Sequence, residues 1–347
     1  MLELKKFLII KKNDKTYLNL YFCHTSIALI FVYIYILASS ISSIINRILF
    51  HNYKFLFNFT LFFLEQSICI IIFSLFNRKI QKNFHSFWKN ICFYILFSTI
   101  YILNVLSVFY GHQLVHNVSM YFTLKKLTPL ILFLNDFFIG KKKLSLMTIL
   151  SIFLIVGGSV LVAKDSFTKD YLGYIIVFIS NFLTVIYCKL TEIYYKITGF
   201  TNIQLLIYNN YLTFPILFLG IFITGEYRRL YTFFQNEYNE NERFVYNLIF
   251  YLIIYGVICS ILTLSFFISN EKNTSLITKL ISNSRAIFVT VFLHVFDKKK
   301  YKLNGIIFFG LFLAILGSIL INIESIIKNV HTKKIIKMKK VIMIKPY

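Results

Sequence analysis

Three basic side chains lie at the centres of long apolar segments, where the sequence predicts the middle of a membrane. Lys125 and Lys126 are adjacent in one such segment, and Arg285 lies in another. A cation at that depth costs about 2.5–3.5 kcal/mol on insertion scales, so each of the three requires a partner. Arginine can bind phosphate oxygens in a bidentate manner, and lysine acts as a point charge. We therefore interpret the three as an anion-binding site that faces a water-filled cavity.

The alternative for these cations is an ion pair inside the protein. The acids within apolar segments are Glu65 and Asp136, and a pair of Glu65 with Lys125 or Lys126 would neutralise part of the charge. The chain has only 14 acids and 7 histidines, and they form no catalytic cluster. An enzyme is therefore not expected, and a multi-span lipid-linked transferase is the weakest of the alternatives.

A second polar group interrupts a different apolar segment, where Tyr208, Asn209 and Asn210 follow one another. Side-chain amides offer donor and acceptor edges that suit a nucleobase, and a tyrosine ring can stack on a base. Hydrogen bonds between membrane helices are the alternative use of the same residues. Pro129 and Pro215 lie close to the two polar groups and are expected to kink their helices.

The composition predicts an all-α integral membrane protein. The hydrophobic fraction is 58% and the charged fraction 15%, whereas soluble domains have about 25% charged residues. With about 20 apolar residues for each crossing, the chain supplies about ten transmembrane helices. The polar stretch 225–243 is read as a loop. The predicted spans are 22–45, 55–76, 91–110, 114–139, 144–163, 171–188, 203–224, 246–269, 274–296 and 303–322.

The net charge of +23 does not indicate nucleic-acid binding, because the lysines lie mostly in loops and tails, where they face water and lipid headgroups. Lys and Arg are more frequent on the side of the two termini, so the positive-inside rule places both termini in the cytosol. The five cysteines are scattered singly, and His112 and His116 have no carboxylate or cysteine nearby. No metal site and no cofactor are predicted.

Short motifs recur in the two halves of the chain. Gly140-Lys141-Lys142-Lys143 returns as Asp297-Lys298-Lys299-Lys300, and Gly157-Gly158-Ser159 returns as Leu316-Gly317-Ser318. A repeat of five spans has an odd number, so the two halves would lie inverted in the bilayer, as in carriers that work by alternating access. The predicted organisation is a tail at 1–21, a first repeat at 22–163, a second repeat at 171–322 and a basic tail at 323–347.

Four further motifs carry a family resemblance: Ile45-Asn46-Arg47-Ile48-Leu49, Leu124-Lys125-Lys126-Leu127-Thr128, Asp170-Tyr171-Leu172-Gly173-Tyr174 and Ile207-Tyr208-Asn209-Asn210. They resemble the nucleotide-sugar transporters of the drug/metabolite transporter superfamily, close to the branch of GDP-mannose and UDP-glucuronate/UDP-N-acetylgalactosamine carriers. The first motif is similar to the family's V-N-K-x-L, and the second is similar to L-R-R-F-[ST]. Asp170-Tyr171-Leu172-Gly173-Tyr174 also fits. Ile207-Tyr208-Asn209-Asn210 looks like F-Y-N-N, which faces guanine in GDP-mannose carriers. Ile281-Ser282-Asn283-Ser284-Arg285 aligns with G-A-L-N-K but keeps only the basic end, so the resemblance implies that Arg285 contacts a phosphate group. The aligned Ser282 and Asn283 are also expected among the substrate-binding residues.

The resemblance implies an antiporter that exchanges a nucleotide-sugar for a nucleoside monophosphate in a Golgi or ER membrane. On the Tyr208-Asn209-Asn210 match, GDP-sugar and GMP stand slightly ahead of UDP-sugar and UMP. Two alternatives stay open: an organellar translocator for triose phosphate or phosphoenolpyruvate, and a proton-coupled exporter that depends on Glu65. The oligomeric state is also open, with a homodimer among the alternatives.

Overall fold

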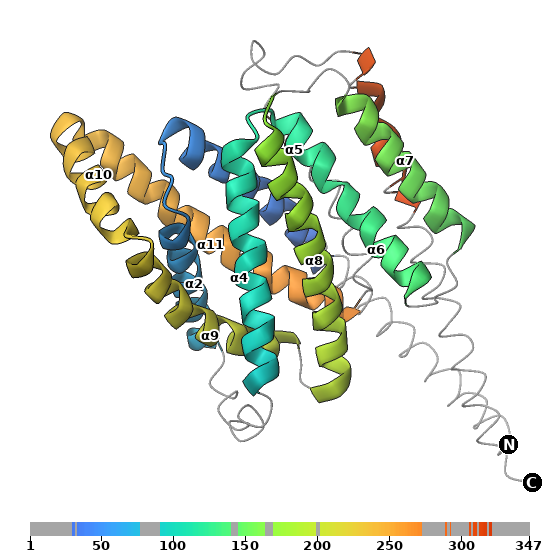
Figure 1. Cartoon of the computed structure of the whole chain (residues 1–347), viewed down its shortest axis with the longest axis horizontal. Helices are drawn as coiled ribbons and strands as arrows, with labels where there is room; N and C mark the ends of the chain where they lie inside the picture. Colours follow the sequence, from blue (N-terminus) through green and yellow to red (C-terminus); the bar gives the residue numbers. More distant parts are fainter. Residues whose placement is uncertain are drawn as a thin grey trace, which may run out of the picture.

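The computed structural model of the chain describes residues 30–76 apart from 32, 91–139, 145–163, 169–198 and 202–272, and single helical positions between 289 and 320. Every regular element within these residues is a helix (Figure 1). This confirms the all-helical prediction for the described part of the chain. Both predicted tails, 1–21 and 323–347, and most of the predicted span 274–296 lie outside the described residues.

Five of the described helices are long and apolar enough to cross a membrane: the first helix (Tyr33–Asn52), α4, α8, α9 and α11. Shorter apolar helices include α2 and α7. The first helix ends in a π-helical turn, η1 (Ile48–Asn52). The other bounds are α2 Asn58–Phe76, α4 Ile91–Leu114, α5 Val118–Lys125, α6 Leu127–Phe138, α7 Leu146–Ala163, α8 Tyr171–Thr198, α9 Asn202–Ile223, α10 Glu226–Glu240 and α11 Glu242–Lys272.

The predicted span 114–139 is two helices in the structure, because α5 ends at Lys125 and α6 begins at Leu127. Proline has no backbone N–H, so Pro129 cannot donate to the carbonyl group four residues earlier, which belongs to Lys125. The helix is therefore interrupted at Lys126, three residues before this proline. Pro215, in contrast, lies inside α9 without ending the helix.

The stretch 225–243 was predicted to be a loop, and this was wrong. Residues Glu226–Glu240 form α10, which packs against α11 and α9. Leu230, Phe233 and Phe234 are spaced for one helix face and pack against the main hydrophobic core. In Figure 1, α10 runs back along the first turns of α11.

Glu226, the first residue of α10, fastens this helix to the start of α2. Its buried carboxylate accepts hydrogen bonds from the backbone N–H and the hydroxyl of Thr60, both at 2.9 Å, and from the backbone N–H of Phe59 at 3.3 Å. The first N–H groups of a helix lack partners within the helix, and a carboxylate there also favours the helix dipole. Glu226 therefore satisfies the N-terminus of α2 from another part of the chain.

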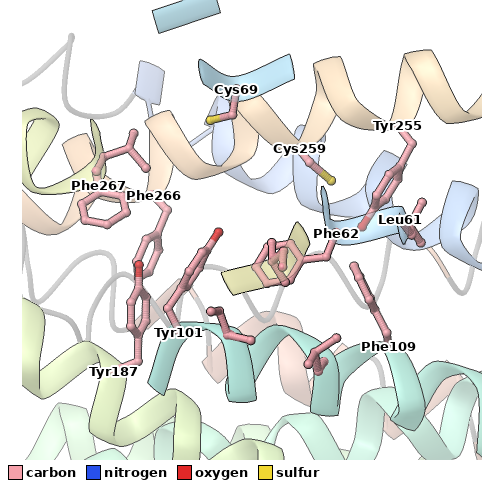
Figure 2. Packing of buried hydrophobic residues seen from close by; sticks show 14 of the residues in the cluster. Leu61, Phe62, Cys69, Tyr101, Phe109, Tyr187, Tyr255, Cys259, Phe266 and Phe267 are labelled. Atoms are coloured by element: carbon pink, nitrogen blue, oxygen red, sulfur yellow. The ribbon is translucent and has the colours of Figure 1, made fainter. Parts of the chain in front are cut away.

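Aromatic rings fill the core between the helices. α4 packs against α8, and α2 packs against α9 and α11. Figure 2 shows Tyr101 of α4, Tyr187 of α8 and Phe266 of α11 turned toward one another. The Tyr101 and Tyr187 rings are stacked with centroids 5.3 Å apart, and Phe266 stacks on Tyr187 at 6.1 Å. These rings form a rigid wall for the cavity described below.

The helix α7 crosses the described helical residues near 310–317, drawn in red beside it in Figure 1, and their contacts are reciprocal. A Cβ atom on Gly158 would lie well under 3.0 Å from the carbonyl oxygen of Gly310 and 3.1 Å from the backbone nitrogen of Ala314. A Cβ atom on Gly317 would lie 2.7 Å from the carbonyl oxygen of Ser151 and 2.8 Å from Ile155.

The contacts at this crossing are symmetric in the two helices. Pairing Gly158 with Gly317 also pairs Ser151 with Gly310, so each helix contacts the other through equivalent positions. Reciprocity of this kind is typical of elements related by a two-fold axis. The contacts also show that residue numbers rise along one helix as they fall along the other. The two helices are therefore antiparallel, as an inverted repeat requires.

Candidate functional site

A cavity of about 190 Å³ lies inside the helix bundle, between the first helix, α2, α4, α5, α6, α8 and α11. Hydroxyl, amide and charged groups make up much of its wall, which is unusual for the interior of a membrane domain. The polar and titratable lining residues are Tyr35, Ser39, Ser42, Ser43, Asn46, Glu65, Tyr101, Asn104, His112, Tyr121, Lys125, Thr128, Thr184, Tyr187, Tyr255, Cys259 and Thr263.

Lys125 is the predicted basic residue that reaches this cavity. It is the last residue of α5, and its side chain is 8% exposed. Its ammonium group donates a hydrogen bond to the hydroxyl of Ser180 on α8 at 2.6 Å. The C-terminus of a helix carries partial negative charge, which favours a cation at this position. The helix break before Pro129 thus positions one ammonium group at the cavity wall.

Lys126 does not line the cavity, although it is also buried, with 3% of its surface exposed. Among the described residues its ammonium group has no ion pair and no hydrogen bond. Successive residues on a helix point about 100° apart, so only one of two adjacent lysines can face a given cavity. The other predicted residues of this group, Ser282, Asn283 and Arg285, lie outside the described residues.

The ion pair proposed between Glu65 and one of these lysines is not seen among the described residues. Within the described part of the chain, Glu65 forms no ion pair with Lys125 or Lys126. Asp136 pairs with Lys189 of α8 at 2.5 Å, and that lysine also lies 3.4 Å from Glu192. The sequence analysis ended the corresponding span at 188 and so missed Lys189. The sequence did contain a signal for Lys189, because it lies three residues before Glu192 and the two side chains share one face of a helix.

The amides predicted to read a nucleobase lie outside the cavity wall, in a polar seam between α9, α2 and α4. Asn209 accepts a hydrogen bond from the Ser98 hydroxyl at 2.9 Å, and Asn210 donates one to the Cys69 thiol at 3.0 Å. The ring of Tyr208 packs edge-on against Tyr94. In this conformation the residues join helices to one another, which was the alternative reading.

Each of the two amides keeps one buried polar atom without a hydrogen-bond partner in the described part of the chain. These atoms are Nδ2 of Asn209, a donor, and Oδ1 of Asn210, an acceptor. An unsatisfied buried polar group costs about 1–3 kcal/mol. The seam therefore holds an unused donor and an unused acceptor on adjacent residues.

Two other segments quoted for the family resemblance meet at the turn between α4 and α5. The guanidinium group of Arg47 donates to the carbonyl oxygens of Val115 and His116. On the other side, Asp170 accepts a hydrogen bond from the backbone N–H of His116 at 3.0 Å, and its carboxylate lies 3.4 Å from the His116 ring. The first helix and the start of α8 therefore hold the turn that follows the cavity residue His112.

The structure also brings to the cavity wall serines of the first helix that the sequence analysis did not single out. Ser39, Ser42 and Asn46 of the first helix line the cavity together with Glu65 of α2. The carboxyl group of Glu65 lies beside the Tyr255 hydroxyl and the Cys259 thiol of α11. A run of serines ending in an asparagine within an apolar span was the signal for this wall. Among the described residues, no group of His, Cys, Asp and Glu is arranged to hold a metal ion.

The fold and the cavity together define a multi-helix membrane protein with a partly polar cavity between its helices. A scan against protein families finds no match. A solved crystal structure superimposes with a TM-score of 0.61 at 13% identity, and the match covers 86% of this chain and 98% of that chain. This likeness concerns the fold alone.

Two curated proteins are similar in sequence. Over 111 residues, 32% of this chain, the identity to UDP-galactose/UDP-glucose transporter 7 of Arabidopsis thaliana is 33%, and the match spans 34% of that relative. Over 280 residues, 80% of this chain and 82% of the relative, the identity to UDP-sugar transporter sqv-7 of Caenorhabditis elegans is 26%. Both relatives are named as transporters of UDP-sugars. This supports the resemblance to nucleotide-sugar transporters.

Proposed function

We propose that the protein exchanges a UDP-sugar for UMP across a membrane of the secretory pathway. The observation that carries the proposal is the buried ammonium group of Lys125 at the wall of a cavity enclosed by helices. A diphosphate would compensate a cation that is otherwise costly at this depth. UDP replaces the GDP favoured by the sequence analysis, because both similar proteins are named for UDP-sugars.

The uracil ring is assigned to the seam beside the cavity. Uracil carries carbonyl acceptors and an N–H donor on one edge, which complement the unused Nδ2 of Asn209 and Oδ1 of Asn210. Tyr208 is the neighbouring aromatic ring. The seam opens to the ligand when α9 separates from α2 and α4, and this movement breaks the contacts of Asn209 with Ser98 and of Asn210 with Cys69.

Alternating access follows from two inverted five-helix halves, for which the reciprocal crossing at Gly158 and Gly317 is the structural support. Arg285 is assigned to the second phosphate, with Ser282 and Asn283 next to it. Both termini are placed in the cytosol, and the membrane is that of the Golgi or the ER. The homodimer stays a prediction.

Exchange is tested with purified protein in liposomes. Vesicles preloaded with UMP are expected to take up labelled UDP-glucose or UDP-galactose several-fold faster than empty vesicles or vesicles loaded with GMP. Equal uptake with and without internal UMP would contradict an exchange mechanism. Preference for internal GMP would restore the guanine assignment.

A second candidate is a translocator of small phosphate esters, favoured by the placement of Tyr208, Asn209 and Asn210 outside the cavity wall. Such a carrier needs Lys125 but no residue that reads a base. Asn209→Ala separates the two functions. UMP affinity is expected to fall about fivefold, because the hydrogen bond that Asn209 would make to the base contributes about 1 kcal/mol. Unchanged UMP affinity, together with exchange of triose phosphate, would favour the second candidate.

A further inference from the structure

The cavity contains an acid as well as a base. Glu65 of α2 is buried, with 6% of its surface exposed, and lines the same cavity as Lys125. No ion pair joins the two side chains in the described part of the protein, so their charged groups are held apart. An acid inside a membrane domain is rare and usually marks a functional site. A bound phosphate would account for the buried charge of Lys125, but it gives no reason for a carboxyl group at Glu65.

A second acceptor lies close to Glu65. Asn46 of the first helix also lines the cavity, and its side-chain oxygen is buried without a hydrogen-bond partner among the described residues. Both side chains are neighbours of Tyr255: the Tyr255 hydroxyl lies beside the Glu65 carboxyl group and interacts with the Asn46 side chain. This part of the wall therefore presents one acceptor that needs a hydrogen-bond donor, Oδ1 of Asn46, close to the carboxyl group of Glu65.

We infer that Glu65 and Asn46 bind the hydroxyl groups of a neutral hexose, while Lys125 holds the phosphates of the same ligand. This inference rests on the proposed function. Neighbouring hydroxyl groups of a sugar can donate two hydrogen bonds to one carboxylate, and bonds to a charged acceptor are stronger than neutral ones. A sugar that carries its own carboxylate, such as glucuronate, would bring a second carboxyl group against Glu65, and at low dielectric the two cannot both be ionised without a large cost. The site therefore selects neutral hexoses against uronic acids.

The wild-type protein tests this selectivity without any substitution. In UMP-loaded proteoliposomes, unlabelled UDP-glucuronate is expected to compete with labelled UDP-glucose at least tenfold more weakly than unlabelled UDP-glucose does. Equal competition by the two nucleotide-sugars would overturn the inference. If UMP exchange itself is absent, the proposed function fails, whereas normal UMP exchange with equal competition removes only the sugar assignment.

Substitutions at Glu65 and Asn46 test whether these side chains bind the sugar. The readout is the ratio of UDP-glucose uptake to UMP uptake, with the exposed Glu240→Gln as the control. Glu65→Ala is expected to lower the ratio at least tenfold, and Asn46→Ala is expected to lower it severalfold. Glu65→Gln keeps an acceptor but removes the charge, so UDP-glucuronate should compete better than in the wild type. Melting temperatures of the purified variants identify any that fail to fold, in which case Asn46→Ala carries the test.

Proton coupling by Glu65 would give a different result. UMP and UDP-glucose uptake would then fall in parallel in Glu65→Gln, and wild-type uptake would follow an imposed pH gradient. Either a parallel loss of this kind or an unchanged ratio in both Glu65 variants would overturn the sugar assignment.

Discussion

The crossing of α7 with the helical residues near 310–317 predicts a sharp difference between two adjacent glycines. Gly158 is buried against the backbone of the crossing helix, and a Cβ atom there would meet a carbonyl oxygen that cannot rotate away. Gly157 is exposed, and a Cβ atom there would have nothing within 4 Å. Alanine at the first position therefore overpacks a contact, while alanine at the second adds only a methyl group on the surface.

Two effects of opposite sign contribute to the stability change of each glycine-to-alanine variant. Overpacking costs about 1–3 kcal/mol, and a backbone obstacle places Gly158→Ala at the upper end of that range. Replacing a helical glycine with alanine stabilises by about 0.5–1 kcal/mol at either position. Gly158→Ala should therefore destabilise by about 2 kcal/mol, and Gly157→Ala should be neutral or slightly stabilising. A shift of about 2–4 °C in Tm per kcal/mol separates the two by several degrees.

The assay is thermal unfolding of the purified variants in detergent, followed by the loss of the monodisperse peak in size-exclusion chromatography. Gly317→Ala is expected to behave like Gly158→Ala, because its Cβ atom would meet Ser151 in the equivalent position. Equal melting temperatures for Gly158→Ala and Gly157→Ala would refute the close crossing. A lowered melting temperature in Gly158→Ala with an unchanged one in Gly317→Ala would refute the two-fold symmetry of the crossing.

Three further predictions concern buried charges. Lys126→Met should raise Tm and leave UMP affinity unchanged, because it removes a buried cation that has no ion pair among the described residues and does not line the cavity. Lower UMP affinity would place Lys126 in the site. Asp136→Asn should lower stability by about 2–4 kcal/mol, because it breaks the buried ion pair with Lys189. Glu192→Gln removes only the longer contact with the same lysine and should cost under about 1 kcal/mol in the same melting assay. Glu226→Gln should lower stability by about 1–2 kcal/mol through weaker capping of α2, with the exposed Glu240→Gln as the neutral control.

The sequence predicted the helical membrane fold well, because apolar composition and span length report directly on the bilayer. It missed α10, although Leu230, Phe233 and Phe234 have helical spacing, because the segment is too polar for a hydropathy window. The expected repeat stays a prediction. What the structure shows is that small residues at Gly158 and Gly317 allow close backbone contact between two helices. The count of ten spans extends beyond the residues that the structure describes.

The candidate site was predicted only in part. Lys125 could be found from sequence because a buried cation is rare, but its neighbour Lys126 looks the same until the helix break fixes which one faces the cavity. Glu65 and Asn46 lie on different helices, so their convergence depends on tertiary packing that no local pattern encodes. The amides Asn209 and Asn210 were singled out because they interrupt an apolar span, and their partners in the structure come from α4 and α2.

The central claim is that the cavity binds phosphate through Lys125. Titration of UMP into the purified protein, followed by calorimetry, tests it most directly when wild type and Lys125→Met are compared. Loss of a charge-assisted contact of about 1.5–3 kcal/mol predicts an affinity at least tenfold weaker in Lys125→Met, with the variant still folded by its melting temperature. UMP binding of equal strength in the two proteins would contradict the account.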